Sequence, residues 1–358
     1  MTDLASSWAN AGAVLTVHRW MAVIGGLLLA SVAILVLCLQ FGATSVDVKT
    51  VATAIMHMLR ADQAGATTLG TSEIIMVQIR FPRVLMGFFV GAGLAAVGVT
   101  LQALLRNPLA DPYVLGVSSG SALGVSLAIL FGIGSSFMLL PILPFCGFAG
   151  GLLALLLIYR LAQSKSRLPI HSLLLAGVIL NAILTAFIMF ITSILEPNRS
   201  AGLMAWLMGS LTAPNYPALS IFLLYVLCVL AMLMHKAQSL NMLTLGEETA
   251  RSLGVETEGI KKWLFILTAL LTGAIVSVSG MIGFVGMVVP HAVRLVIGSD
   301  HRLLLPASAL VGGMFLAVAD TIARTIMAPA EIPVGIVTAL TGGPFFLYLL
   351  LWRKDRMV

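Results

Sequence analysis

The sequence predicts an all-α protein that crosses a membrane about ten times. Of its 358 residues, 59% are hydrophobic and only 9% are charged, whereas an average soluble domain carries about 25% charged residues. The few charges are also clustered, and they leave seven uncharged runs of about 20 residues or more. These runs are 20–46, 84–105, 112–159, 168–195, 200–235, 263–293 and 332–352.

Each uncharged run predicts one or two membrane-spanning helices. About 20 apolar residues in a helix cross the roughly 30 Å of hydrocarbon, and a helix is required because no water satisfies the backbone there. Dividing the longer runs at their Gly and Pro clusters gives ten spans. They lie near 20–41, 81–105, 114–132, 139–160, 171–195, 218–235, 263–282, 283–298, 303–324 and 333–352.

Three segments do not fit this set. Segment 47–78 is too polar to span and is expected to form a loop with some helix. Segment 200–211 is apolar but too short to cross, which favours a re-entrant or interfacial helix. Segment 236–262 is the largest polar interruption. We therefore expect one membrane domain over 1–358, embedded over 20–352.

The basic residues predict the orientation, because cytoplasmic loops carry an excess of Lys and Arg. With the N-terminus inside, 14 of the 20 Lys and Arg are cytoplasmic. The other six, outside, are Lys49, Arg60, Arg80, Arg83, Arg199 and Arg324. Both termini and segment 236–262 are then cytoplasmic, and 47–78 is external. The net charge of +6 reflects this topology rather than nucleic-acid binding.

A weak internal repeat supports the same arrangement. Shifting the sequence by about 180 residues places glycines and prolines of the second span on those of the seventh. The aligned pairs are Gly91 with Gly273, Gly98 with Gly280, and Pro108 with Pro290. The two spans are five crossings apart, so the copies run in opposite directions. Inverted repeats over spans 2–5 and 7–10 are typical of transporters.

The chain shows no motif for covalent chemistry. It contains no G-x-x-x-x-G-K-[ST] loop and no H-E-x-x-H pair, and no catalytic Ser, His and Asp set can be picked out. We therefore expect no enzyme activity, cofactor or metal site. Asp320 is the one acid well inside an apolar run, with Arg324 one helical turn later as its expected partner.

Two polar motifs flank the second span. Arg80 and Arg83 precede it, where guanidinium groups on a rigid helix end can pair with carboxylates of an acidic partner. Snorkelling to the membrane interface fits the same residues. Asn107-Pro108-Leu109 follows the span and breaks the helix.

A third motif lies in 236–262. Residues 246–254, GEETARSLG, predict a short helix with Thr244 or a neighbour as its cap, acidic residues in its first turn, and Gly254 at its end. Ala250 and Leu253 are expected on one face, with Arg251 beside them. An ordinary loop helix fits this pattern, but its cytoplasmic position favours docking of another protein.

Together these motifs resemble the permease subunits of ABC importers for iron siderophores, haem and cobalamin, the FecCD-type or type II importers. The resemblance covers roughly 20–353. It rests on R-F-P-R, GAGLAAVGVTLQALLRNPLADPYVLGVSSG, GEETARSLG, GFVGMVVPHAVRL, SDHRLLLP and AEIPVGIVTALTGGPFF.

The resemblance implies a multi-pass permease of the bacterial inner membrane that works as a homodimer. Its other expected partners are two cytoplasmic ATP-binding subunits, a periplasmic binding protein and the lipid bilayer. The expected cargo is an iron chelate, either a siderophore or haem, with cobalamin as the alternative; an ion-gradient-driven secondary transporter is the competing class. The resemblance assigns ATPase coupling to Gly246, Glu247, Ala250, Arg251, Leu253 and Gly254, binding-protein docking to Arg80, Arg83 and Arg324, and the cytoplasmic gate to Asn107 and Leu109.

Overall fold

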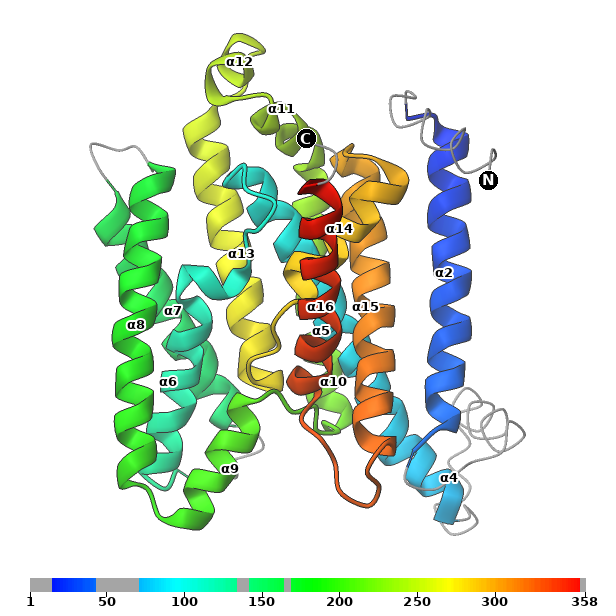
Figure 1. Ribbon diagram of the computed structural model, residues 1–358, viewed down its shortest axis with the longest axis vertical. Helices are drawn as coiled ribbons and strands as arrows, with labels where there is room; N and C mark the ends of the chain where they lie inside the picture. The colour runs from blue at the N-terminus through cyan, green and yellow to red at the C-terminus, as the bar shows by residue number, and fades with distance from the viewer. Residues whose placement is uncertain (1–14, 43–70, 134–141, 164–168, 355–358) are drawn as a thin grey trace.

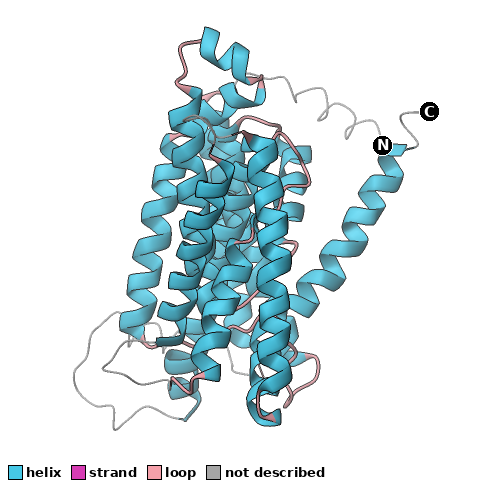
Figure 2. Ribbon diagram, turned by 90° about the vertical axis from the view of Figure 1, so that its left-hand side faces the viewer, coloured by secondary structure: helices cyan, strands magenta, loops and turns pink. Residues whose placement is uncertain are grey.

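The computed structural model describes residues 15–42, 71–133, 142–163 and 169–354, which fold into helices joined by short turns (Figure 1; Figure 2). The apolar helices are α2 (Val17–Gln40), α5 (Phe81–Leu104), α6 (Val117–Leu130), α7 (Ile142–Ala162), α8 (Ile170–Ile194), α10 (Tyr216–His235), α13 (Thr257–Ser279), α14 (Val285–Ile297), α15 (His301–Thr325) and α16 (Val334–Lys354). The connecting elements are α4 (Thr71–Ile75), η2 (Met76–Arg80), η3 (Pro112–Leu115), α9 (Pro197–Leu207), α11 (Ala237–Thr244) and α12 (Glu247–Ser252).

The ten predicted spans are confirmed as helices. Within the described residues, seven helices are long and apolar enough to cross a membrane, and three shorter apolar helices are α6, α14 and α16. Helix α14 has 13 residues, about 20 Å at 1.5 Å per residue, so it does not cross the hydrocarbon alone. Its start follows the non-helical turn 280–284, and it ends before Gly298.

The described part of segment 47–78 is the helix that the prediction included, and it continues further than expected. Residues 71–80 are helical as α4 and η2, and they continue into α5, so that one apolar helix runs over Glu73–Leu104. Glu73 belongs to α4, which lies at the lower end of the bundle in Figure 1. Residues 43–70, the rest of the predicted external segment, lie outside the described residues.

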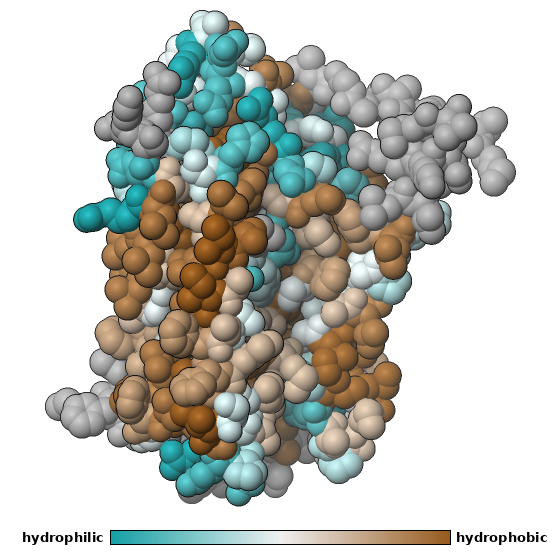
Figure 3. Space-filling view, turned by 60° about the vertical axis from the view of Figure 1, so that its left-hand side comes forward, coloured by the Kyte–Doolittle hydropathy of each residue, from teal (hydrophilic) through white to brown (hydrophobic). Residues whose placement is uncertain are grey.

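Helix α5 lies in the middle of the bundle. In the most apolar 18-residue stretch of the helix over Glu73–Leu104, which contains α5, 89% of the residues are buried, against 22% in the corresponding stretches of α2 and α8. The outer helices therefore expose Leu, Ile and Phe side chains rather than charges, as expected for a surface that faces lipid. Figure 3 shows this apolar surface as a wide band with hydrophilic residues gathered at its two ends.

Glycines allow close contacts between α5 and its neighbours. A Cβ on Gly91 would collide with the backbone of Gly312 on α15, and one on Gly98 would collide with the carbonyl oxygen of Gly286 on α14. Small residues let membrane helices approach in this way.

Pro290 leaves an unpaired carbonyl in α14 because it has no N–H for the oxygen of Gly286, four residues earlier. The side-chain amide of Gln102 on α5 donates to this oxygen at 3.4 Å and to that of Met287 at 3.2 Å. At this crossing α5 provides two things. Gly98 leaves space for the backbone of α14, and Gln102 provides the hydrogen bond that Pro290 cannot make.

The inverted repeat is visible in the helix lengths and contacts. Helices α5 to α8 have 24, 14, 21 and 25 residues, and α13 to α16 have 23, 13, 25 and 21. When α5 to α8 are matched in order with α13 to α16, equivalent helices make crossed contacts between the two repeats. Helix α7 contacts α13 and its equivalent α15 contacts α5; helix α6 contacts α13 and its equivalent α14 contacts α5. Helices α5 and α13 start from opposite ends of the bundle, next to α4 and α12 respectively (Figure 1).

The apolar segment 200–211 forms the short helix α9 and then loses helical structure. Beyond it, the N–H of Ser210 donates to the oxygen of Ser279 at 2.9 Å, and the oxygen of Gly209 accepts from the N–H of Val334 at 3.0 Å. This backbone joins the end of α13 to the start of α16.

The start of α2, the end of α16, and α11 and α12 lie at one end of the bundle; α4 and α9 lie at the other (Figure 1). The segments predicted to be cytoplasmic are thus together, and so are those predicted to be external. We refer to these as the α12 end and the α4 end.

Candidate functional site

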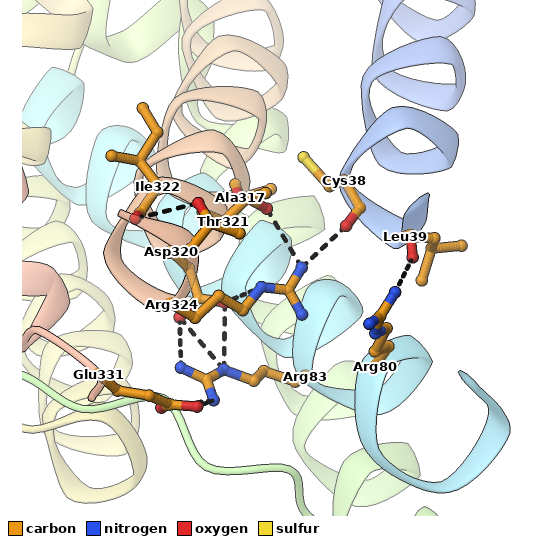
Figure 4. A network of polar contacts seen from close by, with 11 residues as sticks. Cys38, Leu39, Arg80, Arg83, Ala317, Asp320, Thr321, Ile322, Arg324 and Glu331 are labelled. Atoms are coloured by element: carbon orange, nitrogen blue, oxygen red, sulfur yellow. Dashed lines mark hydrogen bonds and ion pairs between the residues drawn. The ribbon is translucent and has the colours of Figure 1, made fainter. Parts of the chain in front are cut away.

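The three arginines predicted to dock a partner lie close together at the α4 end (Figure 4). They come from η2, α5 and α15, and their side chains point toward α2 and α15 rather than away from the protein. Arg80 and Arg324 are buried, and the side chain of Arg83 is 12% exposed. The structure therefore does not present them as a free cationic surface.

Two of these arginines bind the C-terminal end of α2. The last four carbonyls of a helix lack partners within it. Arg80 donates to the oxygens of Leu39 and Gln40 at 3.1 and 3.3 Å, and Arg324 donates to that of Cys38 at 2.8 Å (Figure 4). Three terminal carbonyls of α2 are thus paired with cations, which also suit the negative end of the helix dipole.

Arg83 joins α5 to α15 and to the α15–α16 turn. Its Nε and Nη2 donate to the carboxylate of Asp320 at 2.9–3.2 Å, and its Nη1 donates to that of Glu331 at 2.9 Å. Asp320 is 2% exposed and Glu331 is 56% exposed. One guanidinium thus holds a buried carboxylate on one side and a solvent-exposed one on the other.

The sequence predicted only part of this network. Asp320 was expected to pair with Arg324, and those groups are 3.8 Å apart. The shorter contacts of Asp320 are to Arg83, 237 residues away, and the role of Glu331 was missed. A buried acid in an apolar run indicated that a cation must lie nearby, but not which one.

At the α12 end, residues 246–254 form the predicted short helix and the turns at its two ends, which we call the knob. Glu247 and Glu248 occupy the first turn of α12. Gly246, rather than Thr244, holds the N-cap position, with φ 112° and no side-chain cap. This φ and the φ of 84° at Gly254 suit glycine, so both glycines of the motif shape the knob.

Charged side chains hold the knob against the start of α13. The ammonium group of Lys261, itself buried, lies 3.1 Å from Glu247 and 2.7 Å from Glu258. Arg251 lies 3.6 Å from Glu258 and donates from Nε to the hydroxyl of Thr257 at 3.0 Å. Arg251 thus helps to fix the knob on α13.

The two apolar residues of the knob differ in exposure. Ala250 is fully buried, whereas Leu253 is 56% exposed. The prediction placed both on one face of the helix, and the structure adds that they differ in burial. Ala250 anchors the knob, and Leu253 offers an apolar contact outside it.

The Asn107-Pro108-Leu109 break forms a turn at the end of α5. The side-chain oxygen of Asn107 accepts from the N–H of Leu109 at 2.9 Å, and both residues are exposed. Arg106 precedes the turn with φ 47°. It lines a hollow of about 680 Å³ together with Gly246, Glu247 and Glu248, so the residue before the turn and the knob share one surface.

Among the described residues, no three His, Cys, Asp or Glu side chains lie close enough together to hold a metal ion. The polar groups of the two sites are engaged in ion pairs and helix ends. At the α12 end Leu253 remains exposed, whereas at the α4 end Arg80 and Arg324 hold α2 and Arg83 joins α5 to α15.

Comparison with known proteins agrees with this geometry. Residues 21–352 match the model of the FecCD transport family. The chain is 44% identical over 289 residues to the cobalamin import system permease protein BtuC of Halobacterium salinarum, covering 80% of this chain and 76% of that protein. It is 43% identical over 288 residues to the hemin transport system permease protein HmuU of Yersinia pestis, covering 79% and 84%.

A solved structure described as an inward-facing metal-chelate type ABC transporter superposes with a TM-score of 0.77 at 32% identity, over 93% of this chain and 99% of that one. Sequence and fold therefore agree over nearly the whole membrane bundle. This chain belongs to the FecCD transport family and is a membrane permease of the ABC importer type.

Proposed function

We propose that this chain is the permease subunit of an ATP-driven, binding-protein-dependent importer of an iron chelate, either a siderophore or haem. Cobalamin is the alternative, because one relative is named for cobalamin and another, at nearly equal identity, for hemin. The chain itself carries out no covalent chemistry; ATP hydrolysis belongs to two separate cytoplasmic subunits. A second copy of the permease completes the translocation path in the inner membrane.

The knob is the observation that carries this proposal. Lys261 and Arg251 hold it rigidly on α13 through ion pairs with Glu247 and Glu258, while Leu253 stays exposed. A rigid knob with an apolar tip and a neighbouring hollow is suited to transmit a push from another protein. We assign Gly246, Glu247, Ala250, Arg251, Leu253 and Gly254 to ATPase coupling.

The turn beside this hollow is proposed as the cytoplasmic gate. Asn107 and Leu109 end α5, the most buried helix, and Arg106 connects them to the same hollow as the knob. A movement of the knob would reach the turn through Arg106. This assignment puts the α12 end, with the start of α2 and the end of α16, in the cytoplasm.

Binding-protein docking is proposed at the α4 end, with a narrower role for each arginine. Arg80 and Arg324 hold α2 in place, whereas Arg83 contacts the incoming carboxylate. That carboxylate would replace Glu331, which is the exposed ligand of Arg83. The Glu331→Gln variant should bind the binding protein more tightly at low salt, by about 1.4- to fivefold, because an exposed ion pair is worth about 0.2–1 kcal/mol. Equal dissociation constants for the two permeases would remove this assignment.

The cargo is tested by uptake into proteoliposomes that contain the permease, its ATPase subunits and its binding protein. Haemin, a ferric hydroxamate siderophore and cyanocobalamin are compared side by side. Uptake of haemin or the siderophore supports the iron-chelate assignment. Uptake of cyanocobalamin alone would replace it with the alternative.

A further inference from the structure

Asn241 on α11 makes a polar contact with the turn between α14 and α15. Its side-chain oxygen accepts from the N–H of His301 at 2.8 Å and lies 2.7 Å from Nδ1 of the same histidine. Its side-chain N–H group donates to the carboxylate of Asp300 at 2.8 Å. We call these three side chains the α11–α15 clasp.

The clasp requires an asparagine at 241. The amide oxygen is the acceptor for His301, so Nδ1 of that ring carries the hydrogen, and the amide N–H group is the donor to Asp300. An aspartate in its place has no donor and would face another carboxylate. The Arg302 side chain donates to Asp300 and holds the pKa of this carboxyl at about 2, so Asp300 is charged and accepts hydrogen bonds at neutral pH.

Helix α11 connects the clasp to the knob. Ala237, Leu240 and Leu243 bury the inner face of α11 against the bundle, and α11 contacts α12, α5 and α15. Apolar contacts of this kind permit sliding because they have no preferred direction. The clasp adds directional hydrogen bonds, which fix α11 to the first residues of α15.

Helix α15 connects the clasp to the arginine network at the α4 end. It is unbroken over 25 residues, about 37 Å at 1.5 Å per residue, and it packs along α5. Asp320 and Arg324, near its C-terminus, contact Arg83 and the last turn of α2 (Figure 4). One continuous helix thus joins the clasp to the proposed docking site.

We infer that Asn241 is the positioning residue through which movement of the knob is passed to α15, and thereby between the ATPase face and the binding-protein face. The inference rests on the proposed function, because it assumes that ATPase subunits contact the knob. It adds a route for the signal: α12, α11, the clasp, α15 and Arg83. Under this inference Asn241 contacts neither cargo nor ATPase.

The test measures ATP hydrolysis by the permease–ATPase complex in nanodiscs, with and without saturating binding protein. The binding-protein-dependent increase in rate reports on communication between the two faces and needs no cargo. Asn241→Ala should reduce this increase by about fivefold or more, the usual scale of coupling between distant sites. Asn215→Ala is the matched control, because Asn215 caps α10 through the N–H of Ala218 at 2.9 Å and lies outside the clasp.

Exchanging the two clasp side chains separates positioning from folding. Asn241→Asp alone places two carboxylates together and should lose the increase. The double variant Asn241→Asp with Asp300→Asn restores one donor and one acceptor between these positions, and it should recover most of the increase. Retention of the full increase in either Asn241→Ala or Asn241→Asp would overturn the inference, as would a failure of the folded double variant to recover it.

Leu253→Asp in the same assay distinguishes failure of the proposed function from failure of the clasp inference alone. If this variant keeps both its ATPase subunits and the full increase, the proposed coupling role of the knob is wrong, and the route through Asn241 falls with it. If Leu253→Asp loses the increase while both single variants at Asn241 keep it, the proposed function stands and only the clasp inference is overturned.

Discussion

Arg83 provides an internal comparison between a buried and an exposed ion pair. Its guanidinium lies 2.9 Å from Asp320 and 2.9 Å from Glu331, but the two carboxylates are 2% and 56% exposed. Asp320→Asn removes the buried charge with almost no change in shape. Glu331→Gln makes the same chemical change in solvent and serves as its control.

The expected losses of stability differ because Asp320 is buried and Glu331 is exposed. Removing one partner of a buried ion pair costs about 3–5 kcal/mol, since the other charge is left without compensation. In Asp320→Asn, Arg83 keeps Glu331 and one amide oxygen, so we expect the lower end, about 3 kcal/mol. An exposed pair contributes at most about 1 kcal/mol, so Glu331→Gln should change stability little.

Unfolding of the purified permease by titration with SDS, followed by tryptophan fluorescence, measures the two losses under one condition. Asp320→Asn should shift the midpoint to clearly lower SDS, and Glu331→Gln should leave it nearly unchanged. Equal shifts for both variants would refute the reasoning that burial sets the strength of this network. In the double variant Arg83 keeps neither carboxylate, so it should lose more stability than Asp320→Asn alone, toward the upper end of about 3–5 kcal/mol.

Further predictions concern packing, coupling and pH. Gly98→Ala places a methyl group against the carbonyl of Gly286 and should destabilise the protein by about 1–3 kcal/mol or more. Gly26→Ala is the control, because a methyl group there meets open space, and it should be neutral or slightly stabilising in the same SDS titration. Equal effects of the two variants would contradict the packing. Leu253→Asp should abolish transport-coupled ATPase activity without changing the SDS midpoint, and normal coupling in the reconstituted complex would show the knob assignment to be wrong. The pKa of Asp300 is lowered to about 2 from 3.8, so its stabilising contribution is present above about pH 4 and is lost as pH falls through about 2. The stability difference between wild type and Asp300→Asn should therefore disappear over that range, and a difference that disappears near pH 6 would contradict the assignment.

The spans were predictable because hydrocarbon imposes a simple rule on composition. Runs without charge, such as 84–105 and 332–352, mark helices regardless of what they pack against. The knob was predictable for a similar local reason, since Gly246 and Gly254 mark the two ends of a short helix. The glycines aligned by the internal repeat include two, Gly91 and Gly98, at which the structure shows close helix packing.

Contacts between distant residues were not predictable in the same way. The position of Arg80 at the end of a span suggested pairing with an acidic partner, but the direction of its side chain depends on where α2 ends in space. The partners Arg83 and Asp320 are 237 residues apart, and Asn241 and Asp300 are 59 apart. No local pattern connects them, because each pair meets only when the helices have packed.

The central claim is that this permease moves its cargo only when separate subunits hydrolyse ATP against its inner face. The most direct test reconstitutes the chain in liposomes, alone or with its ATPase subunits and binding protein, and supplies haemin, a ferric hydroxamate siderophore or cyanocobalamin, with imposed proton or sodium gradients. We expect accumulation against a concentration gradient only in the complete complex with ATP. Accumulation by the lone chain, driven by an ion gradient without ATP, would contradict the claim and favour a secondary transporter.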